Sequence, residues 1–268
     1  MQHPVTFRWF GVAGVAITAN GQTLALDPFF SRPPYSRFLL GRPVPSRRLA
    51  EHLLPACDYV LVSHSHWDHV MDVPAVARHT GAIAFGSPNT CGLLRLHGVP
   101  AAQIRLIQAG EHLRLGSFGV EVLRASHGFV PFLGGVGPLA SDLRPPLRLR
   151  DYRRDVCFGF RVEVAGYRLL LLPGRALPAD VLFMLPVMRG PAYYGPFLRR
   201  VQPAVVVPVH WDNLFLPLTQ PLREYGRGTA RLKQYVEHYV PGARFLKPEL
   251  FRPYSLPELL ADRTAGAR

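Results

Sequence analysis

Lysine is nearly absent from this 268-residue chain. Only Lys233 and Lys247 are lysines among its 31 basic residues, so arginine supplies almost all of the positive charge. With 18 acidic residues, the formal net charge is +13. Such an excess suggests an anionic partner: nucleic acid, a phosphate ester or an acidic membrane surface. We favour instead the arginine usage of a GC-rich genome, because the charge is spread along the chain without the interleaved aromatic residues of a nucleic-acid module.

Cysteine is also scarce. Cys57, Cys91 and Cys157 are odd in number and widely spaced, and no Cys-x-x-Cys pair occurs. This pattern excludes a disulfide framework and predicts buried free thiols.

Three further absences bear on the location of the protein and on its catalytic chemistry. No run of about 18 uncharged apolar residues is present, so no transmembrane segment is expected. Residues 1–19 lack the charged and then apolar layout of a signal peptide, so the expected location is cytoplasmic. No Gly-x-Ser-x-Gly sequence occurs, and the usual mark of a serine nucleophile is therefore missing.

Hydrophobic residues make up 48% of the chain, enough for a substantial core. Short apolar or alternating runs predict strands, and Asn20-Gly21 predicts a hairpin turn between two of them. The expected strands are 5–10, 13–19, 22–27, 59–62, 82–85, 104–107, 112–115, 118–123, 156–164, 167–172 and 204–209.

Helices are expected among these strands, which gives an α/β layout. The four helices are predicted at 48–55, 73–80, 88–97 and 226–240. No repeat or low-complexity linker divides the chain, so we expect a single domain at 1–255 and a mobile tail at 256–268. Residues 29–50 are rich in proline and arginine, and we interpret them as an irregular loop over the mouth of a site.

The most informative stretch is Ser63–His69, which has the pattern His-x-His-x-Asp-His. It follows the predicted strand at 59–62, and strand ends are where rigid scaffolds present reactive groups. Neutral imidazole is the commonest metal ligand and suits zinc or iron. The first two histidines can point the same way from an extended loop, while the aspartate and the third histidine turn toward a neighbouring position. The stretch therefore predicts one metal site or two adjacent ones. A solvated polar loop is the alternative, but it gives no reason for three histidines at this spacing.

This pattern resembles the signature of the metallo-β-lactamase-fold superfamily of metal-dependent hydrolases. Further features follow in matching order, so the resemblance covers about residues 5–250. It implies an α/β fold, called α+β in some schemes, with four layers. Two mixed sheets would lie face to face with helices outside, as an αββα sandwich with the metal at the sheets' shared edge.

The resemblance also implies two groups of three metal ligands. The first group is His64, His66 and His127, and the second group is Asp68, His69 and His210. The expected cofactor is zinc, as one or two ions, with iron or manganese as alternatives. An open three-histidine zinc site lowers the pKa of its water to about 7, so the implied chemistry is attack by metal-bound hydroxide, with Asp68 as the catalytic carboxylate. Without a second ion, the second group would orient the nucleophile.

Two positions bear on how the metal is supported. Asp27, in Asp27-Pro28 at a strand end, resembles a recurring family residue that supports the metal loop from behind, and a simple turn former is the alternative.

After the strand at 167–172 the superfamily commonly has Gly-Asp, whose carboxylate bridges two metals, but this chain has Gly174-Arg175. Because two divalent cations repel each other, loss of that carboxylate should weaken the second site. Arg175 would pair with Asp68, bind an anionic substrate group or point away. The chain thus resembles a mostly uncharacterised branch that lacks the bridging aspartate.

The expected substrate wall combines aromatic and aliphatic side chains with arginine. Residues 129–155 show no clear periodicity, and a loop this long is usually functional or mobile, so we interpret it as a lid, with a structural insertion as the alternative. This composition favours an amphipathic or acidic small molecule, lipid-like in some cases: an ester, a lactone or a phosphodiester. Nucleic acid is not an expected substrate. The side chains expected behind or around the site are Trp67, Trp211, Phe129, Phe132, Tyr193, Tyr194, Phe197, Phe215, Leu216, Arg144, Arg148, Arg150, Arg153 and Arg154.

Two other functions remain open. Some members of the superfamily are di-iron redox proteins, but they depend on acidic bridging ligands and an appended flavin domain that this chain lacks. A catalytically degenerate scaffold, which binds metal or a ligand without turnover, is the second alternative, and Arg175 is the residue that favours it. The oligomeric state is not predicted.

Overall fold

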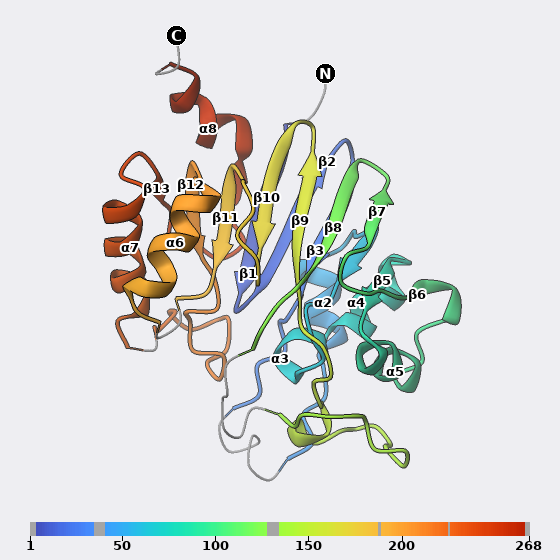
Figure 1. The fold of residues 1–268 in the computed structure, drawn as a ribbon. Coiled ribbons are helices and arrows are strands. Elements are labelled where there is room, and N and C mark those ends of the chain that lie inside the picture. The colour runs from blue at the N-terminus through green and yellow to red at the C-terminus, as the bar shows by residue number, and fades with distance from the viewer. Residues whose placement is uncertain (1–3, 35–40, 128–133, 187–188, 225, 266–268) are drawn as a thin grey trace.

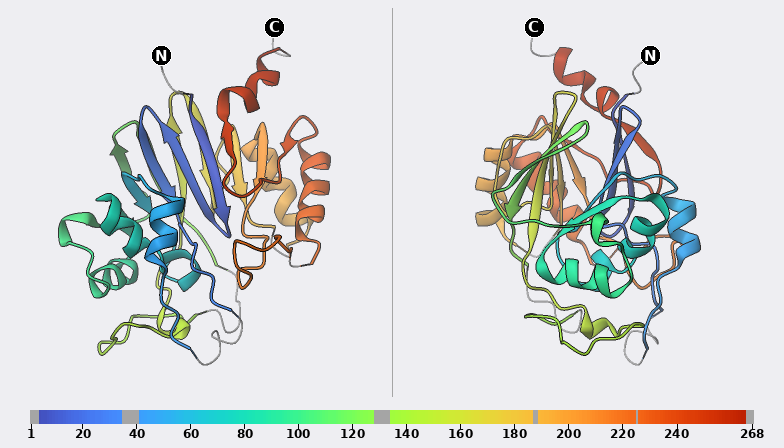
Figure 2. Two further views of the ribbon diagram at one scale, coloured as in Figure 1. Left: turned by 180° about the vertical axis from the view of Figure 1, so that it is seen from behind. Right: turned by 90° about the vertical axis from the view of Figure 1, so that its right-hand side faces the viewer.

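Two seven-stranded sheets face one another in the computed structural model, which describes residues 4–34, 41–127, 134–186, 189–224 and 226–265 (Figure 1). Helices cover the outer faces of the two sheets, as the two further views make plain (Figure 2). The predicted α/β class and the four-layer αββα arrangement are therefore confirmed.

The first sheet is built mainly from the N-terminal half of the chain. An antiparallel meander of β1, β2 and β3 continues into parallel β4, β5 and β6, and β14 pairs antiparallel with β1 at the other edge. The strands are β1 (Thr6–Gly11), β2 (Gly14–Ala19), β3 (Gln22–Leu26), β4 (Tyr59–Leu61), β5 (Ile83–Gly86), β6 (Ile104–Leu106) and β14 (Pro253–Ser255).

The second sheet repeats this plan. Antiparallel β7, β8, β9 and β10 continue into parallel β11, β12 and β13. The strands are β7 (His112–Leu115), β8 (Phe118–Arg124), β9 (Phe158–Val164), β10 (Tyr167–Leu171), β11 (Val181–Met184), β12 (Val205–Pro208) and β13 (Arg244–Phe245). Parallel pairing at the β10–β12 end places the carboxyl ends of these strands at one edge of the sheet.

The helices start and stop at ordinary capping residues. Helix α5 begins after Ser87, whose hydroxyl accepts a hydrogen bond from the Thr90 N–H, and α4 ends at Gly81 in the left-handed conformation. The helices on the first sheet are α2 (Arg47–Leu53), α4 (Val73–Thr80) and α5 (Pro88–Leu96), and those on the second are α6 (Pro191–Val201) and α7 (Gly228–Tyr239). The short helix α3 (Trp67–Val70) lies at the edge shared by the two sheets (Figure 1).

Strand alternation divides the apolar side chains into three layers of core. In β1, Phe7 and Trp9 point between the sheets, while Phe10 points toward the helices of the first sheet. The layer between the sheets also buries Phe118, Phe160 and Phe183 on the second sheet. The third layer lies between the second sheet and α6 and α7.

The C-terminal segment differs from its prediction as a tail. Residues 256–265 form helix α8 (Leu256–Ala265), and residues 266–268 lie outside the described residues. Leu256 is fully buried, and Leu259 and Leu260 pack against the core between the sheets, which gives this helix an apolar stripe at helical spacing. Within the described ranges, no helix combines the length and the apolarity needed to cross a bilayer.

The expected loop at 29–50 is only partly irregular. Phe29 and Phe30 are fully buried in the core beneath the helices of the first sheet, and α2 occupies 47–53. The start of this segment is therefore part of the core and does not lie over a site mouth, and residues 35–40 lie outside the described residues.

Replacement of Phe183 by Ala should lower the free energy of unfolding by about 3–5 kcal/mol, because it opens a cavity in the central layer. Phe183 is fully buried in β11 and packs edge-on against Phe7, with 5.0 Å between ring centroids. Urea denaturation followed by circular dichroism measures the loss. Leu106→Ala, at a 54% exposed position in β6, is the control and should stay within about 0.5 kcal/mol. Equal losses would contradict this placement of the core.

Candidate metal centre

The six predicted ligands all follow the carboxyl ends of strands. The motif at 64–69 follows β4 and includes α3, His127 follows β8, and His210 follows β12. Because β4 belongs to one sheet and β8 and β12 to the other, ligand atoms from both sheets come together in two close groups. Helix α3 lies at the edge that the two sheets share (Figure 1). This placement explains why residues so far apart in the chain converge.

The first group is compact. The ligand nitrogens of His64, His66 and His127 lie within 4.8 Å of one another, and the three ring centroids are 4.7–4.8 Å apart. His64 and His66 are buried, and the Nε2 atom of each makes no hydrogen bond with any residue that the structure describes. A buried nitrogen without a partner costs about 1–3 kcal/mol, and a bound cation would offset that cost. Three imidazoles with a free position for water form the donor set of an open zinc site, and imidazole also suits iron.

The second group contains the only carboxylate among the six. Asp68, His69 and His210 offer ligand atoms within 4.8 Å of one another. Asp68 Oδ2 lies 3.2 Å from Nε2 of His210 and 3.6 Å from Nε2 of His69. The two groups touch, since the ring centroids of His64 and His69 are 3.9 Å apart. The arrangement can hold one ion or two neighbouring ions.

Asp27 and Ser63 fix two of the imidazoles from behind. The Ser63 N–H and hydroxyl donate to the two oxygens of Asp27, and Nδ1 of His69 lies 2.7 Å from Asp27 Oδ2. Because the Ser63 hydroxyl donates to Asp27, its oxygen is left to accept from Nδ1 of His64 at 3.0 Å. Both rings then carry their proton on Nδ1, and the lone pair of Nε2 is free for a metal.

His66 is held from the other side by the segment at 134–155. Gly134 has φ of +149°, and a Cβ atom there would lie 2.6 Å from Cδ2 of His66, so only glycine allows this approach. The backbone of Gly135 forms a hydrogen bond with the His66 ring. A hydrogen bond of this kind orients the ring, as it does for most metal-binding histidines.

The same segment is attached to the metal loop and to α5. The carbonyl of Arg153 accepts hydrogen bonds from Ser65 Oγ at 2.6 Å and from Asn89 Nδ2 at 2.8 Å. Residues 134–155 therefore form a wall that is fixed beside the first group. The predicted wall residues Phe129 and Phe132 lie outside the described residues, and the lid interpretation of that part stays a prediction.

Two of the three imidazoles of the first group, His64 and His66, are held in the neutral form. Burial and the neighbouring imidazoles keep the pKa of His64 well below its ordinary value. Burial lowers the pKa of His66 to about 4, with Asp68 acting in the opposite direction. Neutral imidazole is the form that binds metal, so both rings are ready to bind at neutral pH.

In the second group the carboxylate is held ionised, and the pKa of one imidazole is raised. Burial acts to raise the pKa of Asp68, but His69 and His210 outweigh it and keep that pKa below its usual range. Burial likewise acts to lower the pKa of His69, but Asp68 and Asp27 outweigh it and the pKa is raised. The centre therefore combines a neutral group with an adjoining group that carries a carboxylate.

Three further predicted site residues, Arg175, Trp67 and Trp211, are not members of the two ligand groups. Arg175 is exposed in the turn after β10, where the predicted bridging position falls. Trp67 is fully buried and packs edge-on against Phe29 at 5.4 Å between centroids, which makes it core beneath the metal loop. Trp211 is 7% exposed and stacks on Trp9 at 5.2 Å, directly behind His210.

The prediction that the aromatic residues of 193–197 line the site mouth is wrong. Tyr194 and Phe197 are buried between α6 and the outer face of the second sheet, where Tyr194 stacks on Tyr235 of α7. The physical reason is that α6 returns across the sheet after β11 and needs an apolar stripe on its inner side, which Tyr194, Leu198 and Val201 supply at i, i+4 and i+7.

Three buried charged groups around the centre were not expected from the sequence. Asp72 accepts from the N–H groups of Phe30 and Ser31, and burial raises its pKa. Arg32 and Asp212 form an ion pair with side chains 1% and 0% exposed. One sequence feature points to this pair: Asp212 lies just beyond the apolar strand at 204–209, and a buried charge requires a partner.

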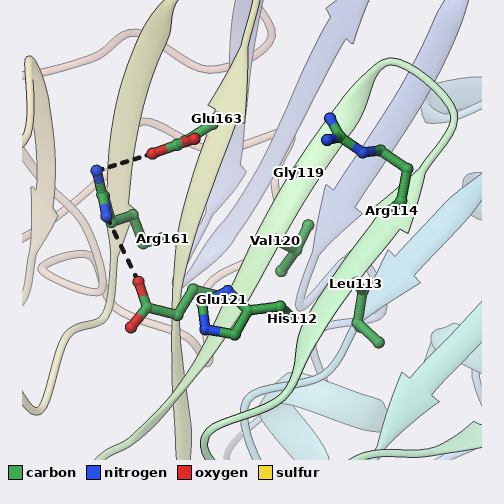
Figure 3. Close-up of a pocket in the computed structure, with 8 residues that line it drawn as sticks. All are labelled: His112, Leu113, Arg114, Gly119, Val120, Glu121, Arg161 and Glu163. Carbon is green, nitrogen blue, oxygen red and sulfur yellow. Dashed lines mark ion pairs between the residues drawn. The ribbon is translucent and has the colours of Figure 1, made fainter.

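A hollow of about 390 Å³ elsewhere on the molecule is unrelated to the imidazoles (Figure 3). It lies on the outer face of β7, β8 and β9, and Arg161 there pairs with Glu163 at 2.7 Å and with Glu121 at 3.5 Å. Partly exposed ion pairs of this kind contribute little stability and are typical of a solvated sheet face.

Comparison with known proteins places the chain in a family. The family described as the Beta-lactamase superfamily domain matches residues 6–210. A UPF0173 metal-dependent hydrolase of Anaeromyxobacter sp. (strain K) is 35% identical over 136 residues, which are 48% of this chain and 46% of that protein. A UPF0173 metal-dependent hydrolase of Symbiobacterium thermophilum is 29% identical over 223 residues, 77% of this chain and 84% of that protein. The chain thus spans less than half the length of the first relative and most of the second.

The fold of the chain is also similar to that of solved metallo hydrolases. Igni18, a novel metallo hydrolase from Ignicoccus hospitalis, superposes with a TM-score of 0.62 at 18% identity, over 95% of this chain and 99% of that one. At such identity the likeness supports the fold alone. Because the family match covers most of the chain and both sheets, this protein belongs to the beta-lactamase superfamily.

Proposed function

We propose that this chain is a metal-dependent hydrolase whose reaction takes place at the shared edge of the two sheets. The observation that carries the proposal is the pair of buried Nε2 atoms on His64 and His66, which lack partners among the described residues and lie within 4.8 Å of a nitrogen of His127. The names of the two relatives, both metal-dependent hydrolases, support it.

The two groups take different roles in this proposal. His64, His66 and His127 hold a zinc ion, with iron and manganese as alternatives, and Asp68, His69 and His210 hold a second ion more weakly. When bound, the metal lowers the pKa of a water ligand and polarises the substrate's carbonyl or phosphoryl oxygen. Asp68 stays ionised, so its carboxylate can accept a hydrogen bond from the attacking water and orient it. Asp27 and Ser63 keep the lone pairs of Nε2 directed at the metal.

We propose an ester, a lactone or a phosphodiester of acidic or amphipathic character as the substrate. The wall at 134–155, which meets the first group at Gly134 and His66, carries exposed arginines: Arg144, Arg148, Arg150 and Arg153. Arg153 is the member attached most directly, because its carbonyl accepts from Ser65 in the metal loop. Phe215, also expected in this wall, instead packs against Trp67 at 5.9 Å and is buried in the core beneath the metal loop. Cytoplasmic location is part of the same proposal.

Zinc-loaded protein should hydrolyse p-nitrophenyl esters or bis-p-nitrophenyl phosphate, and chelation should abolish the activity. His64→Ala should reduce both zinc content and rate by more than the roughly 10–100-fold that outer-shell changes cost, because it removes a direct ligand. His112→Ala, which changes an exposed histidine in β7, is the matched control and should keep wild-type rates. Zinc content is measured by plasma mass spectrometry. A zinc-replete protein without turnover would favour the degenerate scaffold.

Arg175→Asp should strengthen the second ion, since it replaces a cation by a carboxylate at the position where the superfamily places its bridging group. A change of two charge units a few ångströms from a divalent ion should tighten the second binding step at least about tenfold. Titration with zinc by calorimetry measures both steps. Arg200→Asp, at an exposed position in α6, makes the same change in net charge and should alter neither step. Unchanged stoichiometry in Arg175→Asp would refute this role.

Metal-free protein should lose stability as the pH falls from about 6.5 toward 4. The pKa of His66 is about 4 in the fold against 6.5 in the unfolded chain, so between these values the unfolded chain binds a proton that the folded one does not. His66 alone accounts for about 3 kcal/mol of this loss. His64 acts in the same direction, and His69, whose pKa is raised, acts in the opposite one. Urea denaturation at several pH values measures the slope, which His66→Gln should flatten. A slope unchanged in that variant would show that His66 is not held neutral.

A further inference from the structure

The segment His210–Asp212 adopts a backbone conformation that its neighbours must stabilise. His210 has φ of +58°, in the left-handed region that residues other than glycine rarely adopt. Such conformations persist only where the surrounding structure fixes them. The contacts that fix this one come from the N-terminal half of the chain.

The turn between β1 and β2 provides the first set of contacts. The N–H of His210 donates to the carbonyl of Val12 at 2.6 Å, and the N–H of Val12 donates to Oδ1 of Asp212 at 2.8 Å. Trp211, between them, stacks on Trp9 with 5.2 Å between ring centroids. Three consecutive residues are thus each held by β1 or by the turn that follows it.

Arg32 provides the second set. Its Nη2 lies 2.5 Å from Oδ2 of Asp212, and its Nη1 donates to the carbonyls of Asn213 at 3.1 Å and Leu216 at 3.4 Å. A single guanidinium therefore contacts a carboxylate and two carbonyls of the loop that follows His210. Only a planar group with several fixed donors makes such contacts at once, and a lysine ammonium does not reproduce them.

Gly11 leaves the space that Arg32 occupies. It has φ of +91°, and a Cβ atom on it would lie 2.0 Å from Nη2 of Arg32 and 3.1 Å from Oδ2 of Asp212. A side chain at this position would displace the guanidinium. The turn, the guanidinium and the carboxylate therefore form one arrangement.

Stability alone is a poor explanation for this arrangement. Desolvation offsets most of the attraction within a buried ion pair, so such a pair is weak evidence for a gain in stability. What the pair does hold in place is His210, the only member of the second group that the second sheet contributes. Nε2 of His210 lies 3.2 Å from Oδ2 of Asp68, across the edge between the sheets.

We propose that Arg32 is a positioning residue, which acts through Asp212 to hold His210 against Asp68 and thereby completes the second ligand group. The part that concerns metal rests on the proposed function. The part that concerns the position of His210 does not, and it applies to the metal-free protein as well.

The test uses two variants of the full chain. Arg32→Lys keeps the charge but loses the forked contacts, and the double variant Arg32→Met with Asp212→Asn removes both charges without leaving an unpaired carboxylate. In metal-free protein labelled with ¹⁵N-histidine, both variants should shift and broaden the ring resonances of His210, identified by their loss in His210→Asn, and leave those of His64 and His66 in place. In zinc titrations the second step should weaken about 10–100-fold, while the first step changes less than about twofold.

Arg168→Lys is the matched control, because Arg168 pairs with Asp180 at 3.0 Å in the same sheet without contacting the ligand groups. It should change neither the resonances nor either zinc step. Wild-type His210 resonances in both Arg32 variants would overturn the proposal, and so would an equal weakening of both zinc steps, which indicates general loss of structure. If the wild-type protein takes up no zinc, the proposed function fails, and the His210 resonances of the metal-free protein still decide this inference.

Discussion

Buried imidazole nitrogens without hydrogen-bond partners are the constraint on which the rest of this centre depends. The Nε2 atoms of His64 and His66 are removed from water and have no partner among the described residues. Each ring nevertheless has one hydrogen bond with a neighbouring residue. Ser63 bonds to Nδ1 of His64, and the Gly135 backbone bonds to the ring of His66. The surrounding structure thus satisfies one side of the ring and leaves the other side for a cation. A fold that only needed to bury histidines would have no reason to divide them in this way.

Three buried carboxylates make the supporting contacts. Each of them belongs to the segment that follows β3 or is bonded to a residue of that segment. Asp27, the first of these residues, holds the metal loop through Ser63 and His69. Asp72, at the start of α4, accepts from the backbone of residues 30 and 31. Asp212, beyond β12, pairs with Arg32. The segment 27–32 therefore contacts the metal loop, the helix after it and the loop of His210, which makes it the common support of ligands from both sheets.

Features that depend on residues close together in the chain could be predicted from the sequence, and features that depend on residues far apart in the chain could not. The motif at 64–69 is local, and the alternation of apolar residues in strands such as β1 is a property of neighbouring residues, so both are predicted well. His127 and His210 are single histidines, and only their order along a familiar fold identified them. The aromatic residues of α6 were misplaced because composition does not tell which face of a sheet a helix covers. Arg32 was overlooked because its role depends on a residue 180 positions away in the chain.

The two ligand groups are not equivalent, and their contacts suggest an order of occupancy. In the first group, the rings of His64 and His66 are held neutral, and their Nε2 atoms have no partner among the described residues, so an ion there replaces no hydrogen bond of these two atoms. In the second group Asp68 already contacts His210, so a second ion must displace this contact. The first ion also makes the second less favourable, because the rings of His64 and His69 are only 3.9 Å apart and like charges at such separations repel strongly. With Arg175 where a bridging carboxylate would offset that repulsion, the proposed centre would fill its first group and hold the second ion weakly.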